Sequence, residues 1–279
     1  MNYIIIARKS AYPLELIKKT VDLIISNGHN AYCLESAVGL VNYSKIQPIS
    51  EKDYGKIDFA IAFGGDGTIL KAAKLLATYE VPVLGINLGT IGYLTDVDKD
   101  EALVSIENLL NNNFFVEDRM SLCVKSKHGE FVAFNEAVIH RGALGHIITI
   151  SVKINNQLIQ TLRADGVIVA TPTGSTAYNL SAGGPIITPL SNSLVLTPIC
   201  AHSLTARPIV IGEESEVTLS ASSFRSDENP SLDIDGKTVA KLSENEAITI
   251  CGSSIKFLLI RTKENNFFSV LQKKLDVID

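Results

Sequence analysis

One aspartate stands in a glycine turn, where a carboxylate is unusual. The apolar segment Phe59–Phe63 runs directly into Gly64–Thr68 (GGDGT), and a helical pattern follows. A strand, a glycine turn and a helix start together present backbone N–H groups and the positive end of a helix dipole to a phosphate. Glycine has no Cβ, so a phosphate can come close to the backbone. We therefore interpret this segment as a phosphate-binding turn, whose members are Gly64, Gly65, Gly67 and Thr68.

The carboxylate of Asp66 would repel a phosphate bound at this turn, so its presence needs a chemical reason. It either holds a metal ion or takes the proton from an attacking hydroxyl, and both roles belong to phosphoryl transfer. A structural alternative is that Asp66 caps the helix that follows. The complete GGDGT sequence after an apolar strand favours chemistry, but several kinase groups contain it. The turn is neither a Walker A loop nor the GxGxxG dinucleotide fingerprint.

A second group of polar residues lies in the middle of the chain. Asp165 precedes an apolar strand, and Thr171–Pro185 (TPTGSTAYNLSAGGP) follows that strand. The small hydroxyls of this segment suit ribose and amide groups, and Tyr178 offers an aromatic face to a base. Asn135–Glu136 can bind sugar hydroxyls and an adenine amino group, although such a pair in isolation is more often a turn or a helix start. Together these residues indicate a nucleotide site.

Two patterns of secondary structure must position these residues. In the first third of the chain, apolar strands alternate with helices, which is typical of a parallel sheet covered on both faces. The segments expected there are strands at Tyr3–Ala7, Asp58–Phe63 and Val81–Asn87, and helices after Pro13, at Thr68–Ala77 and at Asp100–Asn112. From about Phe114 onward short strands dominate. We expect them at Ser121–Val124, Phe131–Phe134, Ile148–Ile154, Gln157–Leu162, Val167–Ala170, Glu216–Ala221, Leu232–Ile234 and Ala247–Ile250.

Three further local patterns complete this interpretation. Asn155–Asn156 and Asp235–Gly236 predict tight hairpin turns. Pro172–Pro208 holds five of the nine prolines, so we expect a functional or closing loop there. Phe267–Ile278 predicts a terminal amphipathic helix that docks on the core.

Composition excludes several classes of protein. The chain has 279 residues, 46% of them hydrophobic and 20% charged, which is ordinary for a globular protein. The net charge of −5 gives no electrostatic reason to bind nucleic acid or an anionic membrane. The chain shows neither a signal peptide nor an apolar run long enough for a membrane span, so we expect a soluble, cytoplasmic protein. The four cysteines and five histidines lack metal-site spacing, so we expect no protein-built metal site.

Taken together, these motifs resemble the NAD kinase family. The resemblance runs from about residue 57 to 208, and more loosely to the C-terminus. The Thr171–Pro185 segment is far more specific than GGDGT. The matching segments are Gly64–Thr68, Asn87–Gly89 with Gly92–Leu94, Asn135–Glu136, Asp165–Gly166, Thr171–Pro185 and Ala201–Pro208.

The resemblance implies a fold and a reaction. An α/β nucleotide- and phosphate-binding domain with a parallel sheet would comprise residues 1–118, and residues 258–279 would return to it as a packed C-terminal helix. Residues 119–257 would form a β-rich, sandwich-like NAD-binding domain, with NAD in the cleft between the two. The adenosine 2′-hydroxyl, deprotonated or oriented by Asp66, would attack the γ-phosphate of ATP in line, with Mg²⁺ spreading the charge. The family implies a homodimer or homotetramer, and leaves open polyphosphate as donor and NADH as substrate.

The resemblance also assigns residues to the dinucleotide. Asp165 would bind the nicotinamide end, Glu136 the nicotinamide side or the ribose, and Thr176–Tyr178 the adenine. Lys71 would lie near phosphate, and Tyr93 would form an aromatic wall. The full set is Asp66, Gly67, Lys71, Tyr93, Asn135, Glu136, His146, Arg163, Asp165, Thr173, Thr176, Ala177, Tyr178, Asn179, Leu180 and Ser181.

Two other functions remain open at this point. A lipid kinase of the diacylglycerol or sphingoid type shares the GGDGT turn and a similar two-domain plan, but the loop Thr173–Ser181 suits a nucleotide better than an acyl chain. A non-catalytic dinucleotide sensor would keep the pocket without the chemistry, yet it would gain nothing from Asp66 beside a phosphate. A dehydrogenase fits least, because the GxGxxG turn is missing.

Overall fold

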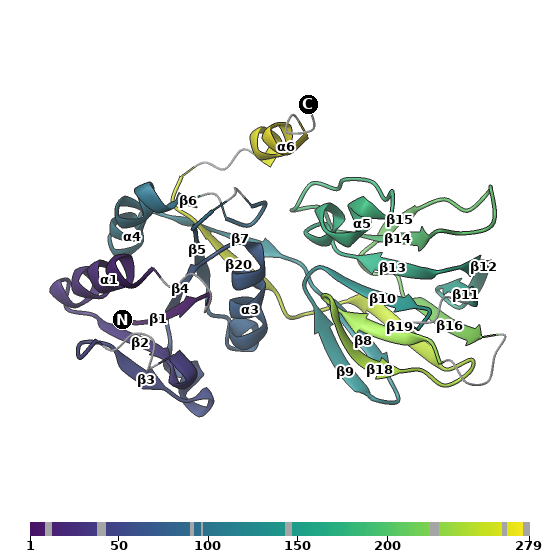
Figure 1. Ribbon diagram of the computed structural model, residues 1–279, viewed down its shortest axis with the longest axis horizontal. Coiled ribbons are helices and arrows are strands. Elements are labelled where there is room, and N and C mark those ends of the chain that lie inside the picture. The colour runs from purple at the N-terminus through teal and green to yellow at the C-terminus, as the bar shows by residue number, and fades with distance from the viewer. Residues whose placement is uncertain are drawn as a thin grey trace. The chain divides into compact units, whose positions relative to one another are not determined.

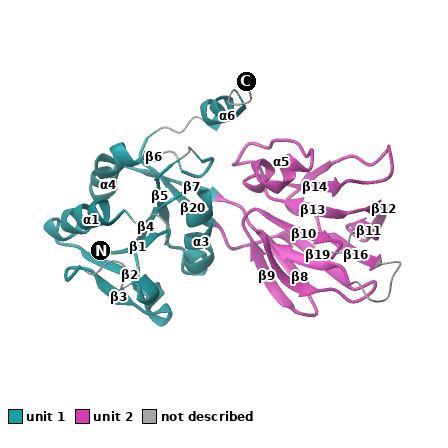
Figure 2. Cartoon of the chain, viewed as in Figure 1, with its two compact units in different colours: residues 1–118, 257–279 teal, residues 119–256 magenta. Residues whose placement is uncertain are grey.

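The chain forms two compact units in the computed structural model shown in Figure 1. The structure describes residues 1–8, 13–37, 43–89, 92–95, 97–142, 147–223, 229–263 and 267–275. Unit 1 comprises residues 1–118 and 257–279, and unit 2 comprises residues 119–256 (Figure 2). The chain therefore leaves unit 1, builds all of unit 2, and returns. The sequence placed that return at residue 258.

The sheet of unit 1 is the parallel sheet expected from the sequence. Its strands run in the order β3-β2-β1-β4-β5-β20-β7, and β6 pairs with β5. The pairs from β3 to β20 are parallel, as is β5 with β6. The central strands are buried along almost their whole length, as apolar strands covered on both faces must be. The bounds are β1 Asn2–Ala7, β2 Asn30–Leu34, β3 Gln47–Ile49, β4 Phe59–Phe63, β5 Val83–Asn87, β6 Val97–Asp98, β7 Phe115–Arg119 and β20 Phe257–Arg261.

Helices follow the strands of unit 1 as the sequence predicts. The α-helices α1 and α4 contribute to one apolar cluster with residues of β1, β4 and β5. The helix α3 begins within the glycine turn, at Asp66, and packs on β4 and β5. The bounds are α1 Leu14–Ser26, α3 Asp66–Leu76, α4 Ala102–Leu110 and α6 Phe267–Leu275, with 3-10 turns η2 Glu35–Ala37, η3 Glu51–Lys56, η4 Ala77–Tyr79 and η5 Lys99–Glu101.

Unit 2 is the β-rich sandwich expected from the sequence. Its two sheets run in the orders β15-β14-β13-β10-β17-β18 and β12-β11-β16-β19-β8-β9. One apolar cluster takes residues from both sheets, so the sheets pack face to face around a shared core. The bounds are β8 Leu122–Ser126, β9 Gly129–Ala133, β10 Glu136–His140, β11 Ile148–Ile154, β12 Gln157–Ala164, β13 Gly166–Ala170, β14 Ser193–Ile199, β15 Ile209–Gly212, β16 Val217–Ser223, β17 Ser231–Ile234, β18 Lys237–Lys241 and β19 Ala247–Gly252, with η6 Gly174–Thr176 and α5 Tyr178–Ser181.

Both hairpin turns are confirmed. Asn155 and Asn156 have φ of 50° and 65°, and Asp235 and Gly236 have φ of 45° and 72°. Two successive left-handed residues are the mark of a type I′ turn, in which Asn, Asp and Gly are favoured.

The expectation of a loop throughout Pro172–Pro208 is wrong in part. The segment contains β14, which pairs with β13 on one side and β15 on the other. Pro198 is tolerated there because the pairing of β14 with β15 already ends at Leu196. Pro198 therefore lies where the pairing with β15 has ended, and it does not mark the absence of a strand.

No helix in the described ranges is both long and apolar enough to cross a membrane.

Candidate active site

The glycine turn joins β4 to α3, as predicted. Gly65 is the N-cap of α3, and no side chain caps that helix end. The alternative in which Asp66 serves as the N-cap is therefore wrong, because Asp66 is the first helical residue. Gly64 must be a glycine for a packing reason, since a Cβ there would lie 2.1 Å from Thr68 Oγ1.

The carboxylate of Asp66 is held by a turn that lies 27 to 29 residues further along the chain. Its Oδ1 accepts hydrogen bonds from the backbone N–H groups of Leu94 (3.0 Å) and Thr95 (3.3 Å) and from the Thr95 hydroxyl (3.3 Å). Among the described residues, Oδ2 accepts one bond, from the Tyr93 N–H at 2.9 Å. One carboxylate oxygen is thus heavily used by the protein, while the other retains capacity for a further donor.

Gly92 makes this arrangement possible. A Cβ at this position would lie 1.9 Å from Asp66 Oδ1 and 2.5 Å from Thr95 Oγ1. The Gly92 N–H also donates to Thr95 Oγ1 at 3.2 Å, so the turn is tied to the same hydroxyl that donates to Asp66. Only glycine lets this backbone lie against the carboxylate.

A cationic cavity adjoins the glycine turn within unit 1. It has a volume of about 340 Å³ and is lined by Ala7, Arg8, Gly65, Gly67, Thr68 and Lys71. Arg8 follows β1, and its N–H donates to the Phe63 carbonyl at 3.1 Å. The carboxyl ends of neighbouring parallel strands meet here, which is where open α/β sheets bind ligands. Two cations beside the start of a helix form a suitable environment for phosphate.

Tyr93 is half-buried beside the C-terminal helix of unit 1. Its ring centre lies 6.2 Å from that of Phe267 and 5.0 Å from Lys274 Nζ. Burial, and then the negative charge of Asp66, raise the pKa of the Tyr93 hydroxyl above its ordinary value. The predicted packing of the C-terminal helix on the first domain is confirmed by these contacts.

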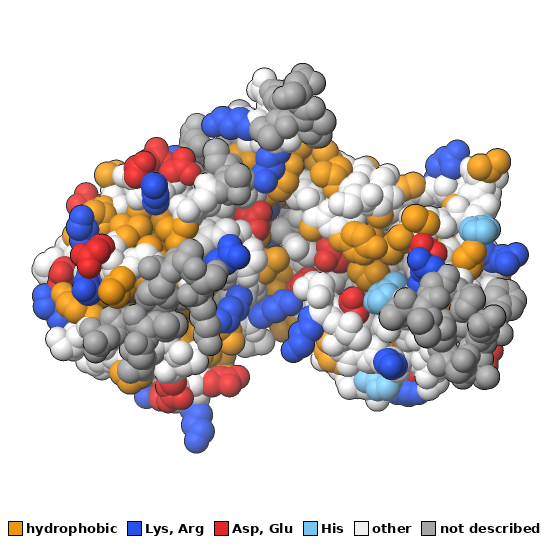
Figure 3. Space-filling model, in the orientation of Figure 1, with side chains coloured by type: hydrophobic (Ala, Val, Ile, Leu, Met, Phe, Trp, Pro, Cys, Tyr) orange, Lys and Arg blue, Asp and Glu red, His pale blue; other side chains and the backbone are white. Residues whose placement is uncertain are grey.

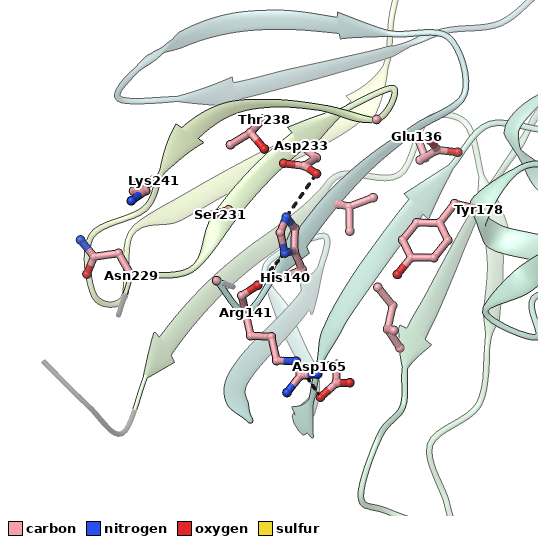
Figure 4. Close-up of a pocket in the computed structure, with 14 residues that line it drawn as sticks. Glu136, His140, Arg141, Asp165, Tyr178, Asn229, Ser231, Asp233, Thr238 and Lys241 are labelled. Carbon is pink, nitrogen blue, oxygen red and sulfur yellow. Dashed lines mark hydrogen bonds and ion pairs between the residues drawn. The ribbon is translucent and has the colours of Figure 1, made fainter. Parts of the chain in front are cut away.

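The larger cavity belongs to unit 2 and has a volume of about 890 Å³ (Figure 4). Three residues assigned to the dinucleotide line it: Glu136, Asp165 and Tyr178. On the face of unit 2 seen in Figure 3, acidic, basic and histidine side chains gather around apolar surface. The further lining residues are Val138, His140, Arg141, Gly142, Ile199, Asn229, Ser231, Asp233, Gly236, Thr238 and Lys241.

One ion pair and one histidine–carboxylate contact lie along one wall of this cavity (Figure 4). His140 Nε2 lies 3.2 Å from Asp233 Oδ2, and Arg141 Nε lies 3.3 Å from Asp165 Oδ1. Across from them, burial raises the pKa of Tyr178, and nearby groups including Asp165 add to the shift. Tyr178 therefore keeps its hydroxyl proton at neutral pH and can act as a hydrogen-bond donor.

Asp235 holds the Asn135–Glu136 segment, a role that the sequence did not reveal. Its carboxylate accepts from the backbone N–H groups of Phe134 (3.1 Å), Asn135 (2.7 Å) and Glu136 (3.1 Å). The hairpin turn between β17 and β18 thereby fixes the turn between β9 and β10. Glu136 begins β10, so the structural alternative of a turn or helix start does not hold for Glu136.

The loop after β13 is built around a buried amide. The side chain of Asn179 is fully buried; its Nδ2 donates to the Ser175 and Pro185 carbonyls, and its Oδ1 accepts from the Thr197 hydroxyl at 2.6 Å. Gly174 lies against the chain at Asn135, whose carbonyl oxygen would be 2.1 Å from an added Cβ. This loop and Asn135–Glu136 are therefore packed together.

Models of two protein domains match most of the chain. The ATP-NAD kinase N-terminal domain matches residues 16–114, and the ATP-NAD kinase C-terminal domain matches residues 134–262. A protein of Thermoanaerobacter sp. (strain X514) named NAD kinase is 39% identical over 269 residues, which are 94% of this chain and 94% of that protein.

The chain belongs to the ATP-NAD kinase family.

Further similarities agree with this assignment. An NAD kinase of Clostridium botulinum (strain ATCC 19397 / Type A) is 37% identical over 265 residues, or 94% of this chain and 92% of that protein. The solved structure of yeast NADH kinase complexed with NADH has a TM-score of 0.88 at 25% identity and covers 100% of this chain and 88% of its own. An NAD kinase from Archaeoglobus fulgidus in complex with ATP shares the fold, with a TM-score of 0.79, 23% identity and full coverage of both chains.

The structure brings together only some of the residues assigned from the family resemblance. Gly65, Gly67, Thr68 and Lys71 line the smaller cavity, and Asp66 contacts the turn that contains Tyr93. Of the loop after β13, Tyr178 lines the larger cavity, whereas Thr173, Thr176, Ala177, Asn179, Leu180 and Ser181 are not among its lining residues. Arg163 lies exposed on β12, and His146 lies outside the described residues. Contact of these residues with NAD stays a prediction.

Local sequence could have indicated one further residue of the site, Arg8, but not Asp235. Arg8 directly follows the strand β1, at the sheet edge where ligands bind in α/β folds. Asp235 stands in a recognised turn, and nothing local indicates that it reaches residues 99 to 101 positions earlier.

Proposed function

We propose that this protein transfers the γ-phosphoryl group of ATP to the 2′-hydroxyl of the adenosine ribose of NAD, giving NADP and ADP. Membership of the ATP-NAD kinase family supports this, as do relatives named NAD kinase at 37% to 39% identity. The similar solved structures hold NADH in one case and ATP in the other, so both kinds of substrate bind to this fold.

Asp66 is the proposed general base, and the observation that carries this role is its place in the glycine turn beside the cationic cavity. Oδ1 accepts three bonds from the turn at 92–95, whereas Oδ2 accepts one among the described residues. Oδ2 is therefore the oxygen available to accept the ribose hydroxyl proton. The deprotonated oxygen then forms the new bond to phosphorus, and the bond from phosphorus to the bridging oxygen of ADP breaks.

The smaller cavity is the proposed site for the phosphates of ATP. Arg8 and Lys71 supply two positive charges, and the N–H groups at the start of α3 point outward from the helix. The described residues contain no cluster of three histidine, cysteine or carboxylate side chains that could hold a metal ion. We propose that Mg²⁺ arrives on the phosphates of ATP, since in kinases this ion needs at most one or two protein carboxylates beside the phosphate oxygens.

The larger cavity is proposed to hold part of the dinucleotide. Its volume of about 890 Å³ lies within the range of small-molecule sites. Tyr178 offers a protonated hydroxyl and an aromatic face, and the carboxylates of Glu136 and Asp165 can accept from ribose or carboxamide groups.

The decisive test is direct. Purified protein is incubated with NAD, Mg²⁺ and ATP, and NADP is detected with an NADP-specific dehydrogenase. Parallel reactions replace ATP by polyphosphate, NAD by NADH, and NAD by diacylglycerol or a sphingoid base. Formation of NADP supports the proposal. Phosphorylation of the lipid alone contradicts it and favours the lipid kinase. If no substrate is phosphorylated, the proposal is also contradicted and the non-catalytic sensor is favoured.

The variant Asp66→Asn tests the base. The amide oxygen can take the place of Oδ1 and keep its three hydrogen bonds, whereas the amide nitrogen faces the Tyr93 N–H, so only one bond to the turn is lost. Turnover is expected to fall by roughly 10²- to 10⁴-fold because the amide cannot accept the proton, while NAD affinity changes by no more than a few-fold. The matched control is Asp58→Asn, since Asp58 precedes the same strand and also accepts a backbone N–H, that of Asn2 at 2.7 Å. Undiminished turnover of Asp66→Asn would remove Asp66 from the role of base.

Two further properties remain proposals. We propose a cytoplasmic location and a homodimer or homotetramer. Light scattering on the purified protein measures the second, and a monomeric mass would contradict it.

A further inference from the structure

A fully buried arginine of unit 1 contacts the turn at 92–95, which holds the carboxylate of Asp66. Arg261 is the last residue of β20, and its side chain has no exposed surface. Its Nε lies 3.1 Å from Glu117 Oε2 on β7, and its Nη1 donates to the Leu94 carbonyl at 3.2 Å. The guanidinium thus joins the returning strand to the turn that holds Asp66.

A single peptide group lies between this guanidinium and the carboxylate of Asp66. The Leu94 carbonyl and the Thr95 N–H belong to the same peptide unit. The carbonyl accepts from Arg261, and the N–H donates to Asp66 Oδ1 at 3.3 Å. A cation on one side of a peptide group and an anion on the other strengthen both hydrogen bonds through polarisation, and they fix the plane of that peptide.

Stability alone does not account for this ion pair, in which Arg261 is fully buried and the Glu117 side chain is 13% exposed. Removing two charges from water is costly, and well-packed apolar residues in place of a buried pair are often neutral or stabilising. The pair Lys263–Glu101 is a useful contrast, because its side chains are 45% and 54% exposed and keep most of their contact with water. No contact joins this pair to the described residues of the turn at 92–95. The burial of Arg261 therefore indicates a requirement other than folding.

We propose that Arg261, held in place by Glu117, is a positioning residue for the catalytic base. It fixes the turn at 92–95, and the turn fixes Asp66 so that Oδ2 stays available to the substrate hydroxyl. This inference rests on the proposed function, in which Asp66 is the base. It also gives a reason for the return of β20 to unit 1, because that strand supplies the guanidinium.

The test separates positioning from folding through an apolar replacement of the whole pair. Arg261→Met removes the guanidinium next to the largely shielded Glu117 carboxylate, whose side chain is 13% exposed, and is expected to unfold at lower urea concentration. The double variant Arg261→Met/Glu117→Leu removes both charges, so it is expected to regain most of that stability. Its kcat is nonetheless expected to stay ~10- to 100-fold below that of the unaltered protein, with the KM for NAD within about twofold, because a small displacement of a catalytic group is costly.

The matched control is Lys263→Met/Glu101→Leu, which removes a neighbouring pair of the same charges and is expected to keep full activity. Amide hydrogen exchange at Leu94 and Thr95 supplies a readout that does not depend on catalysis. Exchange is expected to accelerate in the Arg261 variants and to stay unchanged in the control.

Each outcome has a distinct meaning. A stable double variant with unaltered kcat, or with unaltered exchange at Leu94 and Thr95, overturns the positioning role. If the unaltered protein forms no NADP, the proposed function fails, and the exchange measurement still decides whether Arg261 holds the turn. Should Arg261→Met not fold, the double variant alone supplies the result.

Discussion

At the scale of single residues, two aspartates are used in the same way. Asp66 accepts from the N–H groups of residues 93 to 95, and Asp235 from those of residues 134 to 136. In both cases a carboxylate fixes the conformation of a backbone segment that is distant in the sequence. Local secondary-structure propensity does not determine the conformation of either segment. Asp66 differs in its place, because it stands between Gly65 and Gly67, which line the cavity that also contains Arg8 and Lys71. That position beside two cations, rather than the pattern of hydrogen bonds, separates the proposed base from a structural anchor.

Replacing Gly92 by alanine is expected to disable the site without unfolding the protein. The new Cβ would fall 1.9 Å from Asp66 Oδ1, so the carboxylate or the turn must move. A catalytic group displaced by about an ångström can cost roughly 100-fold in turnover, and we expect a loss of kcat of that order. Gly89→Ala is the control, because a Cβ there meets nothing within 4 Å. Equal kcat values for the two variants would contradict the geometry.

At the scale of elements, the structure shows which parts of the fold local sequence can specify. Central strands such as β4 are uninterrupted apolar runs, and the predictions found them. The strand β10 was not predicted, because Asn135–Glu136 at its start resembles a turn. The strand β14 was not predicted either, because it contains Pro198. The strand β20 carries no local sign of the sheet to which it belongs, since its neighbours β5 and β7 lie far away in the sequence.

In the candidate site, too, the residues of a contiguous motif could be predicted, whereas partners from distant parts of the chain could not. Asp66 could be predicted because its glycine turn is contiguous. Its partners at 93–95, the cation Arg8 and the anchor Asp235 could not be derived from local pattern, because each acts across a long sequence separation. The family resemblance supplied Tyr93 and Asp165, but it gave no role to Arg8, Asp233 or Arg261.

Asp235→Asn tests the link between two hairpin elements. Asparagine tolerates the left-handed turn, but its amide group replaces one accepting oxygen with a donor that faces backbone N–H groups. We expect the KM for NAD to rise by roughly tenfold, and stability to fall by about 1.5–3 kcal/mol, the usual worth of hydrogen bonds to a charged group. Steady-state kinetics and urea unfolding measure the two effects.

The control for this variant is Asn155→Asp in the other type I′ turn of unit 2. Asn155 Oδ1 accepts the Glu216 N–H at 2.9 Å, an interaction that aspartate preserves. If both variants change the KM for NAD equally, Asp235 has no particular role in holding Asn135–Glu136.

At the scale of the whole molecule, each unit has its own apolar core, so the unfolding of each unit can be monitored through a residue of its core. Tyr3 is fully buried in the cluster of unit 1, where burial, and then the charge of Asp58, raise its pKa to about 12. The core of unit 2 is the cluster between its two sheets. A probe at Tyr3 therefore reports on unit 1.

Alkaline pH is expected to destabilise unit 1 through Tyr3. A pKa raised on folding contributes stability that is present below the unfolded value of about 10 and is lost as pH rises toward about 12. Between pH 10 and pH 12, the free energy of unfolding in urea is therefore expected to fall more for the unaltered protein than for Tyr3→Phe. Parallel pH dependence of the two proteins over that window would show that Tyr3 does not titrate as the fold implies.

The split of unit 1 between the two ends of the chain also sets an order of events during translation. Residues 1–118 emerge first, yet the strand that lies between β5 and β7 is synthesised only after all of unit 2. A nascent chain can complete the β-sandwich while its first sheet still lacks an inner strand. We therefore expect the site around Asp66 to be completed only after synthesis has passed residue 261, and chains truncated before β20 to be inactive.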